Sequence, residues 1–391
     1  MTPASLRGWR LVHRWTSLIC SVNLLILCVT GLILVFHHEI QHLMGEDLDT
    51  TRTEGQAHLP LQSLPIQSLV DIARKADPAL VPKLFSVDPD DAGANYIYLG
   101  APGLRDFEDG RWVVLNAQTG ANQVLKPPEE TLTGFLLKLH VDLFTGFPGQ
   151  MFVGVMGILF VVSTVSGLVV YGPFMKKLAF GLLRFGRGPR IANIDLHNLF
   201  GVATLTWAFV VGLTGAILSF SPLIVSYWQN TELTAMAARH TEPMTGAPIS
   251  IDPISIDRAA QAGLAVFPGK DLAFIAYPGN DYSSDRHFSV MVRGHTELTK
   301  RLLSVALVDA ETGMVVETAD TPWYMTVLLL SGPFHFGDYG GLPLQILWAL
   351  FTIITGVVTV TGFIAWVKRP RARTAGAEER AVAASKAGSK A

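Results

Sequence analysis

Four long runs of apolar residues stand out against the more polar remainder of the chain. They cover residues 15–36, 151–172, 199–220 and 344–367, and none contains Asp, Glu, Lys or Arg. A helix needs about 20 apolar residues to cross the hydrocarbon core of a bilayer. The pattern therefore predicts four membrane-spanning helices. The first run is longer than a leader peptide requires and has no Ala-x-Ala site, so we expect it to be retained.

Two long polar segments, 37–150 and 221–343, lie between these runs. In each, one stretch has apolar residues at helical spacing, and other stretches alternate as strands do. The pattern predicts a small α+β domain in each segment, with helices over 66–76 and 256–266. The expected strands cover 96–99, 112–115, 288–292, 303–309 and 314–318.

The segments outside the apolar runs fall into two charge classes. Segments 1–14, 173–198 and 368–391 hold three, five and seven basic residues against none, one and two acidic ones. Segments 37–150 and 221–343 hold eight and seven basic residues against 16 and 13 acidic ones. Because short basic segments favour the cytoplasm, we expect both termini and the middle loop inside, and the two acidic domains outside.

Several spacings recur between the two halves of the chain. His13 precedes Gly31 by 18 residues, as His197 precedes Gly215, and His140 precedes Gly167 by 27 residues, as His335 precedes Gly362. The turn sequences 116–120 (Asn-Ala-Gln-Thr-Gly) and 309–313 (Asp-Ala-Glu-Thr-Gly) also match. We therefore predict a membrane α-helical fold, a four-transmembrane-helix bundle built from two tandem repeats. Parallel repeats of this kind suggest a pseudo-twofold axis along the membrane normal.

Composition narrows the protein classes further. Hydrophobic residues make up 49% of the 391 residues and charged residues only 16%, which excludes a wholly soluble protein with its usual charged fraction of about 25%. A net charge of −2 excludes a strongly basic nucleic-acid binder. The two cysteines, Cys20 and Cys28, both lie in the first apolar run and exclude a disulfide scaffold. We expect them to pack as small buried hydrophobes.

The repeat selects four of the 11 histidines as candidate ligands. His13 and His197 fall at the cytoplasmic ends of the first and third spans, and His140 and His335 fall on the outer side. Two facing imidazoles can hold a haem iron from both axial sides, whereas zinc usually needs four ligands. Five helical turns place Gly31 on the face of His13 and Gly215 on that of His197, which would leave room for a flat ligand. Interfacial anchoring, helix capping and a proton relay are the alternatives.

Other residues are weaker candidates. His37 and His38 follow the first span and suit interfacial roles or a replacement outer ligand. Asp142, Asp195 and Asp338 could orient the imidazoles, act as caps or be solvated carboxylates. Arg14 and Arg190 could neutralise haem propionates or only reflect the positive-inside bias. An aromatic belt or a stacking surface would use Trp228, Trp323 and Tyr324. Solvated surface is expected for His58, His240, His287 and His295.

These motifs resemble the PepSY-associated transmembrane-helix family, which includes siderophore reductases of the bacterial inner membrane. The resembling residues are His13-Arg-Trp with Thr30-Gly31, Leu139-His140, Asp195-Leu-His197, and Phe334-His335-Phe with Gly340-Gly341. The resemblance implies periplasmic PepSY-like domains and a multi-pass protein of the inner membrane with both termini cytoplasmic. His37-His38 after the first span departs from the family pattern.

The resemblance also implies a function. His13 and His197 would ligate one non-covalent haem b, and His140 and His335 a second. The chain would then be a haem-dependent ferric-siderophore reductase, with a docking cleft between its acidic domains. Because no Gly-x-Gly-x-x-Gly opens a nucleotide-binding unit, we expect a separate cytoplasmic or quinol electron donor. The alternative is a non-catalytic PepSY-domain sensor or peptidase regulator.

Overall fold

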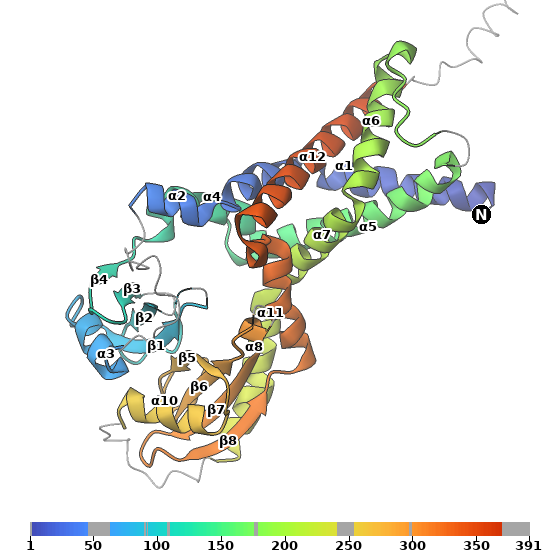
Figure 1. Cartoon of the computed structure of the whole chain (residues 1–391). Helices are drawn as coiled ribbons and strands as arrows, with labels where there is room; N and C mark the ends of the chain where they lie inside the picture. The colour runs from blue at the N-terminus through green and yellow to red at the C-terminus, as the bar shows by residue number, and fades with distance from the viewer. Residues whose placement is uncertain are drawn as a thin grey trace, which may run out of the picture. The chain divides into compact units, whose positions relative to one another are not determined.

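The computed structural model describes residues 2–45, 63–89, 91, 93–107, 110–175, 179–240, 254–296 and 299–369. Most of the basic tail 368–391 and all of His58 therefore lie outside the described residues. Among these described residues, three uninterrupted helices are long and apolar enough to cross a membrane: α1 (Pro3–Leu34), α5 (Phe147–Met175) and α12 (Gly341–Val367). The chain is thus a multi-pass membrane protein with a separate antiparallel β-sheet (Figure 1).

The predicted third span is not one continuous helix, which corrects the expectation of a straight helix over 199–220. It is divided into α6 (Pro189–Ala203) and α7 (Leu205–Ser219), which meet at 71°. Thr204 leaves helical geometry at the break, with φ −100° and ψ 1°. Its hydroxyl donates to the Phe200 carbonyl at 2.9 Å, a bond that bends helices, and Gly201 lies three residues earlier. His197 and Gly215 therefore lie on different helices, and the predicted shared face does not exist.

Short helices connect the long ones to the sheet. In the first half of the chain these are α2 (His37–Leu43) and α4 (Leu132–Val141). In the second half, α8 (Ser221–Trp228), the π-helical turn η3 (Gln229–Leu233) and α9 (Thr234–Ala238) precede the strands, and α11 (Trp323–Phe336) follows them. Short 3₁₀ turns within the described residues are η1 (Pro128–Glu130), η2 (Phe185–Arg187), η4 (Thr299–Arg301) and η5 (Asp338–Gly340).

Strands from both polar segments join in one antiparallel sheet of eight strands within the described residues. Their order is β4-β3-β2-β1-β5-β6-β7-β8. The first segment supplies β1 (Val81–Val87), β2 (Ala94–Gly100), β3 (Arg111–Asn116) and β4 (Asn122–Val124). The second supplies β5 (Asp271–Ala276), β6 (His287–Arg293), β7 (Leu303–Asp309) and β8 (Val315–Asp320). The sequence analysis did not predict β1 and β5, whose pairing joins the two segments through Phe85 opposite Ile275.

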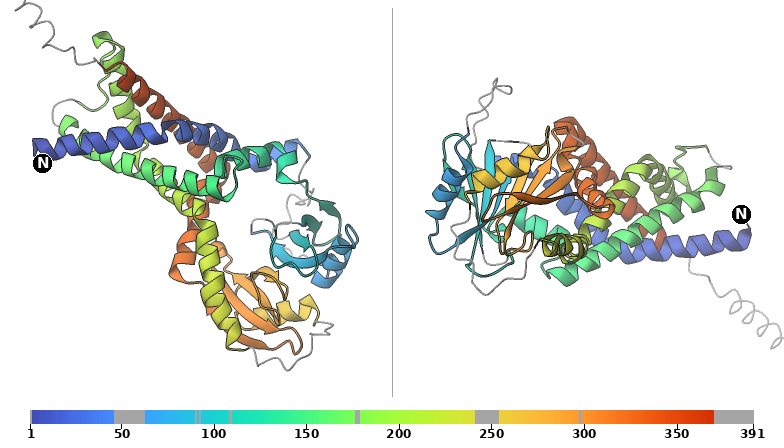
Figure 2. Two further views of the ribbon diagram at one scale, coloured as in Figure 1. Left: turned by 180° about the vertical axis from the view of Figure 1, so that it is seen from behind. Right: turned by 90° about the horizontal axis from the view of Figure 1, so that it is seen from below.

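Each half of the sheet carries one helix on the same face. Apolar residues at helical spacing form α3 (Ile66–Arg74) and α10 (Ile256–Ala265), and α10 lies across β5, β6 and β7 (Figure 2). Their buried faces meet Phe85, Ile275 and Phe288 in one continuous core. Both predicted helices are thus present and stabilise the sheet by burying its apolar face.

A second core covers the other face of β6, β7 and β8. It contains Trp228 and Met236 from the α8–α9 region, Met291 and Leu307 from the sheet, and Leu328 from α11. Trp228 is only 4% exposed. Its expected place in an aromatic belt is therefore wrong, since its ring packs inside the protein.

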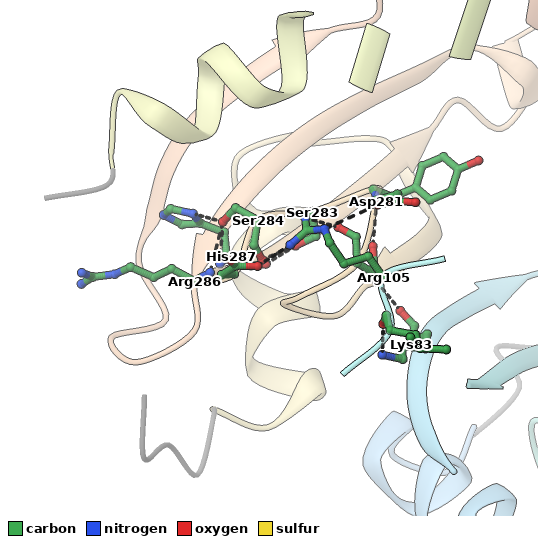
Figure 3. Close-up of polar contacts among 11 residues, drawn as sticks. Lys83, Arg105, Asp281, Ser283, Ser284, Arg286 and His287 are labelled. Atoms are coloured by element: carbon green, nitrogen blue, oxygen red, sulfur yellow. Dashed lines mark hydrogen bonds and ion pairs between the residues drawn. The ribbon is translucent and has the colours of Figure 1, made fainter. Parts of the chain in front are cut away.

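A polar joint links the two halves of the sheet (Figure 3). The Arg105 guanidinium bonds to Asp285 and to the Asn280 carbonyl at 3.0 Å, and it lies 3.5 Å from Asp281. The side chain of Asn280 in turn donates to the Lys83 carbonyl at 2.7 Å. These bonds, together with the β1–β5 pairing, join the halves where two separate domains with a cleft between them were expected.

Candidate functional site

The structure brings the four selected histidines together as two pairs. The rings of His13 on α1 and His197 on α6 have their centroids 6.1 Å apart, with 59° between their planes. The rings of His140 on α4 and His335 on α11 are 6.2 Å apart, with 64° between their planes. The first pair lies in a compact unit of residues 1–29, 158–209 and 349–391, and the second in a unit of residues 30–157 and 210–348.

In every imidazole, the Nδ1 nitrogen has an oxygen partner. His13 Nδ1 donates to the Ser163 carbonyl at 2.9 Å, and His197 Nδ1 to the Val358 carbonyl at 2.8 Å. His335 Nδ1 donates to a carbonyl of α7, that of Val211, at 3.0 Å. A carbonyl can only accept, so these rings carry their proton on Nδ1 when neutral. The Nε2 lone pair is then available to a metal.

His140 differs from the other three histidines. Its Nδ1 lies 2.7 Å from the hydroxyl oxygen of Thr30 on α1. The Thr30 side chain is 2% exposed, and Gly31 follows it in the same helix. The second pair is therefore held by one backbone oxygen and one side-chain oxygen.

Each imidazole also packs against a glycine of another helix. A Cβ added at Gly31 would lie 3.2 Å from His140 Cε1, and one at Gly215 would lie 2.7 Å from His335 Cε1. In the other unit, Gly167 meets His13 at 3.0 Å and Gly362 meets His197 at 2.9 Å. Gly31 therefore makes room for His140, whereas the sequence analysis assigned it to His13.

The glycines explain how the rings reach the helix backbone. Gly167, Gly215 and Gly362 each follow by four residues the carbonyl that accepts from the same ring. A side chain at that position would cover the carbonyl. A hydroxyl residue precedes each glycine, as in Ser166-Gly167 and Thr361-Gly362. This recurring dipeptide was visible in the sequence, but the choice of its partner histidine was not.

The pair geometry fits two ligands on opposite sides of one metal. A metal–imidazole bond is about 2.0–2.1 Å, and a ring nitrogen lies about 1.1 Å from the ring centre, so two trans imidazoles have centroids about 6.3 Å apart. Both observed separations match this value. Among the described residues there is no group of three or more His, Cys, Asp or Glu side chains that could hold a metal ion. A two-imidazole donor set is incomplete for zinc and complete for a bis-histidine haem.

Two buried arginine nitrogens accompany the His13–His197 pair. Arg14 follows His13 on α1, and Arg190 precedes His197 by seven residues, or about two turns, on α6. The Nε atoms of both are buried and without a hydrogen-bond partner in the described part of the chain. Because a buried N–H needs an acceptor, each of these two atoms fits as a donor to an anionic group, such as a propionate.

The nearby carboxylates have other partners. Asp195 is buried and accepts from Arg184 Nη2 at 2.7 Å, Nε at 3.0 Å and the backbone amide at 2.9 Å. It fixes the turn before α6, which corrects the expectation that it orients an imidazole, caps a helix or lies in solvent. Asp142 accepts from the Phe144 amide at 2.8 Å after α4 ends. The side chain of Asp338 lies outside the described residues.

His37 and His38 lie at the start of α2, and their ring centroids are 4.0 Å apart. His37 Nδ1 donates to the Leu34 carbonyl at 2.9 Å, which satisfies the C-terminal end of α1. This places His37 in a helix-end role. Neither side chain is needed to complete the two pairs described above.

The remaining predicted residues have varied surroundings. His287 is fully buried, so the expectation that it is solvated is wrong, and its Nδ1 bonds to the Ser284 hydroxyl at 2.7 Å (Figure 3). His240 Nε2 lies 2.7 Å from Glu317, and His295 is mostly exposed. Trp323 is 78% exposed, and the Tyr324 hydroxyl donates to Glu232 at 2.8 Å. Cys20 and Cys28 are both buried free thiols, as expected.

Comparison with known proteins identifies similar sequences. The profile of the PepSY-associated TM region matches residues 10–369. An uncharacterized protein of Pseudomonas aeruginosa, PA4219, is 34% identical over 108 residues. That alignment covers 28% of this chain and 25% of the relative.

Proposed function

Because the chain belongs to the PepSY-associated transmembrane family, we propose that it is a di-haem electron-transfer protein that reduces ferric siderophores in the bacterial periplasm. The two histidine pairs carry the proposal. Each pair offers two imidazoles, 6.1 and 6.2 Å apart between ring centroids, with Nδ1 already bound to oxygen, and each pair would hold one haem. An imidazole held in this way is fixed in orientation and strengthened as a donor.

The proposed architecture is a four-helix bundle formed by two tandem repeats, with α6 and α7 together as the third span. Equivalent contacts in the two halves support the duplication. Gly31 contacts His140 as Gly215 contacts His335. In the same way, Gly167 contacts His13 as Gly362 contacts His197. The turns at Asn116 and Asp309 are also built alike, since each side chain accepts from the amides two and three residues later.

The proposed location is the inner membrane, with both termini in the cytoplasm and the sheet in the periplasm. The support is the charge of the short segments, which follows the positive-inside rule. In this orientation the His13–His197 pair lies toward the cytoplasm and the His140–His335 pair toward the periplasm. A ferric siderophore would meet the surface of the joined sheet, because β1 and β5 are paired where a cleft was expected.

The chemistry asks little of the protein beyond binding and orientation. Bound haem supplies a one-electron iron(III)/iron(II) couple. The two imidazole pairs would hold the haems, and three backbone carbonyls and the Thr30 hydroxyl orient the rings. Arg14 and Arg190 would donate hydrogen bonds to haem carboxylates. Reduction of the substrate iron(III) to iron(II) weakens its binding to the hard oxygen ligands of a siderophore. The electron comes from a separate cytoplasmic reductase or a quinol.

Haem content tests the proposal directly. Protein purified after expression with haem supply should hold about two haems per chain in a pyridine haemochrome assay. His140→Ala or His335→Ala should remove one haem, and His13→Ala or His197→Ala the other. His295→Ala is the matched control, because this exposed side chain lies 3.8 Å from Asp271 and belongs to neither pair.

Activity is measured separately. Proteoliposomes with an internal reductant should reduce external ferric hydroxamate, detected by an iron(II) chelator, and each of the four alanine variants should lose this activity. A colourless wild-type protein would contradict the proposal and favour the sensor or peptidase-regulator alternative. Full haem content in all four variants would show that the assigned ligands are wrong.

A further inference from the structure

The four imidazoles differ in one feature of their hydrogen bonding. Backbone carbonyls accept from His13, His197 and His335, whereas a side chain, that of Thr30, lies at His140 Nδ1. The contact joins residues 110 positions apart in the chain. A backbone carbonyl is present whatever the residue is, but a hydroxyl depends on the residue at that one position. The Ser163 hydroxyl also lies 3.4 Å from His13 Nδ1, but its removal would leave the closer Ser163 carbonyl in place. Among the contacts of the described residues, His140 is therefore the paired imidazole whose Nδ1 partner a residue change can remove.

The corresponding threonine in the second half of the chain has no histidine among its hydrogen-bond partners in the described residues. Thr214 precedes Gly215 as Thr30 precedes Gly31, and its hydroxyl donates to the Val210 carbonyl at 2.7 Å. A helical threonine ordinarily donates to the carbonyl one turn earlier. The same hydroxyl lies 3.3 Å from the Val211 carbonyl, but it is not the partner of His335, because His335 Nδ1 donates to that carbonyl itself. The two halves thus place chemically identical residues at equivalent positions, with only one of them holding a ligand.

The geometry fixes the direction of the Thr30–His140 bond when His140 binds a metal. Coordination through Nε2 places the imidazole proton on Nδ1, so the ring donates and the hydroxyl oxygen accepts. At 2.7 Å this is a short, well-formed hydrogen bond. It is also shielded from water, because the Thr30 side chain is almost fully buried. No solvent molecule would readily replace the hydroxyl if it were removed.

We infer that Thr30 is a positioning residue that holds His140 and sets the reduction potential of the haem at the His140–His335 pair. This inference rests on the proposed function. An acceptor on Nδ1 increases the electron donation of the imidazole to iron, which favours iron(III). Loss of the acceptor leaves a buried N–H unsatisfied and makes His140 a weaker ligand. The potential of that haem then rises, while the haem at the His13–His197 pair is unaffected.

The test uses three variants of the full-length protein. Thr30→Val keeps the side-chain shape and removes the acceptor, Thr30→Ser keeps the hydroxyl, and Thr214→Val is the matched control in the other repeat. Haem content is measured first by pyridine haemochrome assay, and the two midpoint potentials are then measured by spectroelectrochemistry. Low-spin haem signals in electron paramagnetic resonance report the orientation of the imidazoles independently of any turnover.

The expected result is a more positive potential for one haem in Thr30→Val and no change in the other. Thr30→Ser restores the wild-type value, and Thr214→Val leaves both potentials unchanged. If purified Thr30→Val contains only one haem, a haem titration should show an affinity at the His140–His335 pair about 10- to 100-fold below that of the wild type. Thr30→Ser should restore this affinity. Equal effects of Thr30→Val and Thr214→Val, or no effect of Thr30→Val, would overturn the inference. A wild-type protein without haem would instead overturn the proposed function.

Discussion

At the scale of single residues, the histidine pairs depend on the glycines beside them. The imidazoles of His13, His197 and His335 each reach a helix carbonyl where the residue one turn later is a glycine. Gly167 lies beside His13 on this basis, with His13 Cε1 only 3.0 Å from the place of a Cβ. The His13 ring cannot easily move away from Gly167, because its Nδ1 donates to the carbonyl of Ser163, which lies on α5 as Gly167 does.

Gly167→Ala should therefore displace His13 and weaken haem binding at the His13–His197 pair by at least about tenfold, the cost of losing a ligand's hydrogen-bond partner. Gly172→Ala on the same helix is the control, since a Cβ there meets no atom within 4 Å. Haem titration of the two purified variants gives the comparison. Equal affinities would mean that the ring tolerates the methyl group.

His287 gives a residue-scale prediction outside the membrane. Burial lowers its pKa, the neighbouring Asp309 opposes this, and Arg286 and His240 reinforce it. The unfolded chain binds a proton here near pH 6.5, but the folded chain does so only at lower pH. The contribution of neutral His287 to the free energy of unfolding of the sheet is therefore fully present above about pH 6.5. It decreases below that pH by at most about 1.4 kcal/mol per pH unit.

Hydrogen exchange of the β6 and β7 amides at pH 7.5 and 5.5 measures this effect. His287→Gln should reduce the difference between the two pH values. His295→Gln, an exposed control, should leave it as in the wild type. A pH response unchanged by His287→Gln would assign the titration to another group.

At the scale of elements, the break between α6 and α7 matters most. α6 ends just before Thr204, and the apolar helix α7 begins directly after that residue. α6 carries His197, whose ring lies beside that of His13, and Arg190 about two turns earlier. The bidentate bond from the Arg184 guanidinium to Asp195 fixes the chain just before the N-terminus of α6. The third span is thus a short positioning helix joined to a membrane helix.

Arg14 and Arg190 provide the element-scale prediction. Arg14→Gln and Arg190→Gln should each weaken haem retention at the His13–His197 pair by about 10- to 100-fold, since a hydrogen bond to a charged group contributes about 1.5–3 kcal/mol. The potential of that haem should also fall, because a nearby positive charge favours the reduced form. Arg187→Gln, an exposed residue of η2, is the control. Unchanged retention in both variants would show that the buried Nε atoms have a different role.

At the scale of the whole molecule, charge is strongly segregated. The two long polar segments carry 29 acidic and 15 basic residues, and the short segments carry the opposite excess. A surface field of one sign attracts ligands of the other sign and repels those of the same sign. If the chain reduces iron complexes as proposed, its two acidic segments should therefore favour cationic or neutral complexes.

We expect a cationic ferric hydroxamate to be reduced with a kcat/KM at least about tenfold above that of a trianionic ferric catecholate at 10 mM salt. Raising the salt to 500 mM should narrow this ratio, because the screening length falls from about 30 Å to a few ångströms. Proteoliposome assays with both complexes at both salt concentrations provide the measurement. A ratio independent of salt would attribute the preference to redox potential or shape.

Local and periodic features were readable from the sequence. An apolar run without charge has one favourable environment, so the spans around α1, α5 and α12 followed directly from composition. The helices α3 and α10 and the strands β2, β3, β6, β7 and β8 followed from apolar spacing and turn residues. The recurring His and Gly spacings selected all four paired histidines, because these spacings are the same in the two halves of the chain.

Contacts between distant segments needed the tertiary structure. No local pattern shows that Gly31 meets His140, that Thr30 replaces a carbonyl there, or that β1 pairs with β5. The burial of His287 and Trp228 likewise results from packing by other elements. The sequence by itself determined which runs are apolar enough to cross a membrane and which histidines recur at matching spacings, since hydropathy and spacing are properties of the chain. Only the fold decided the partner of each histidine, because that depends on which helix backbone lies beside it.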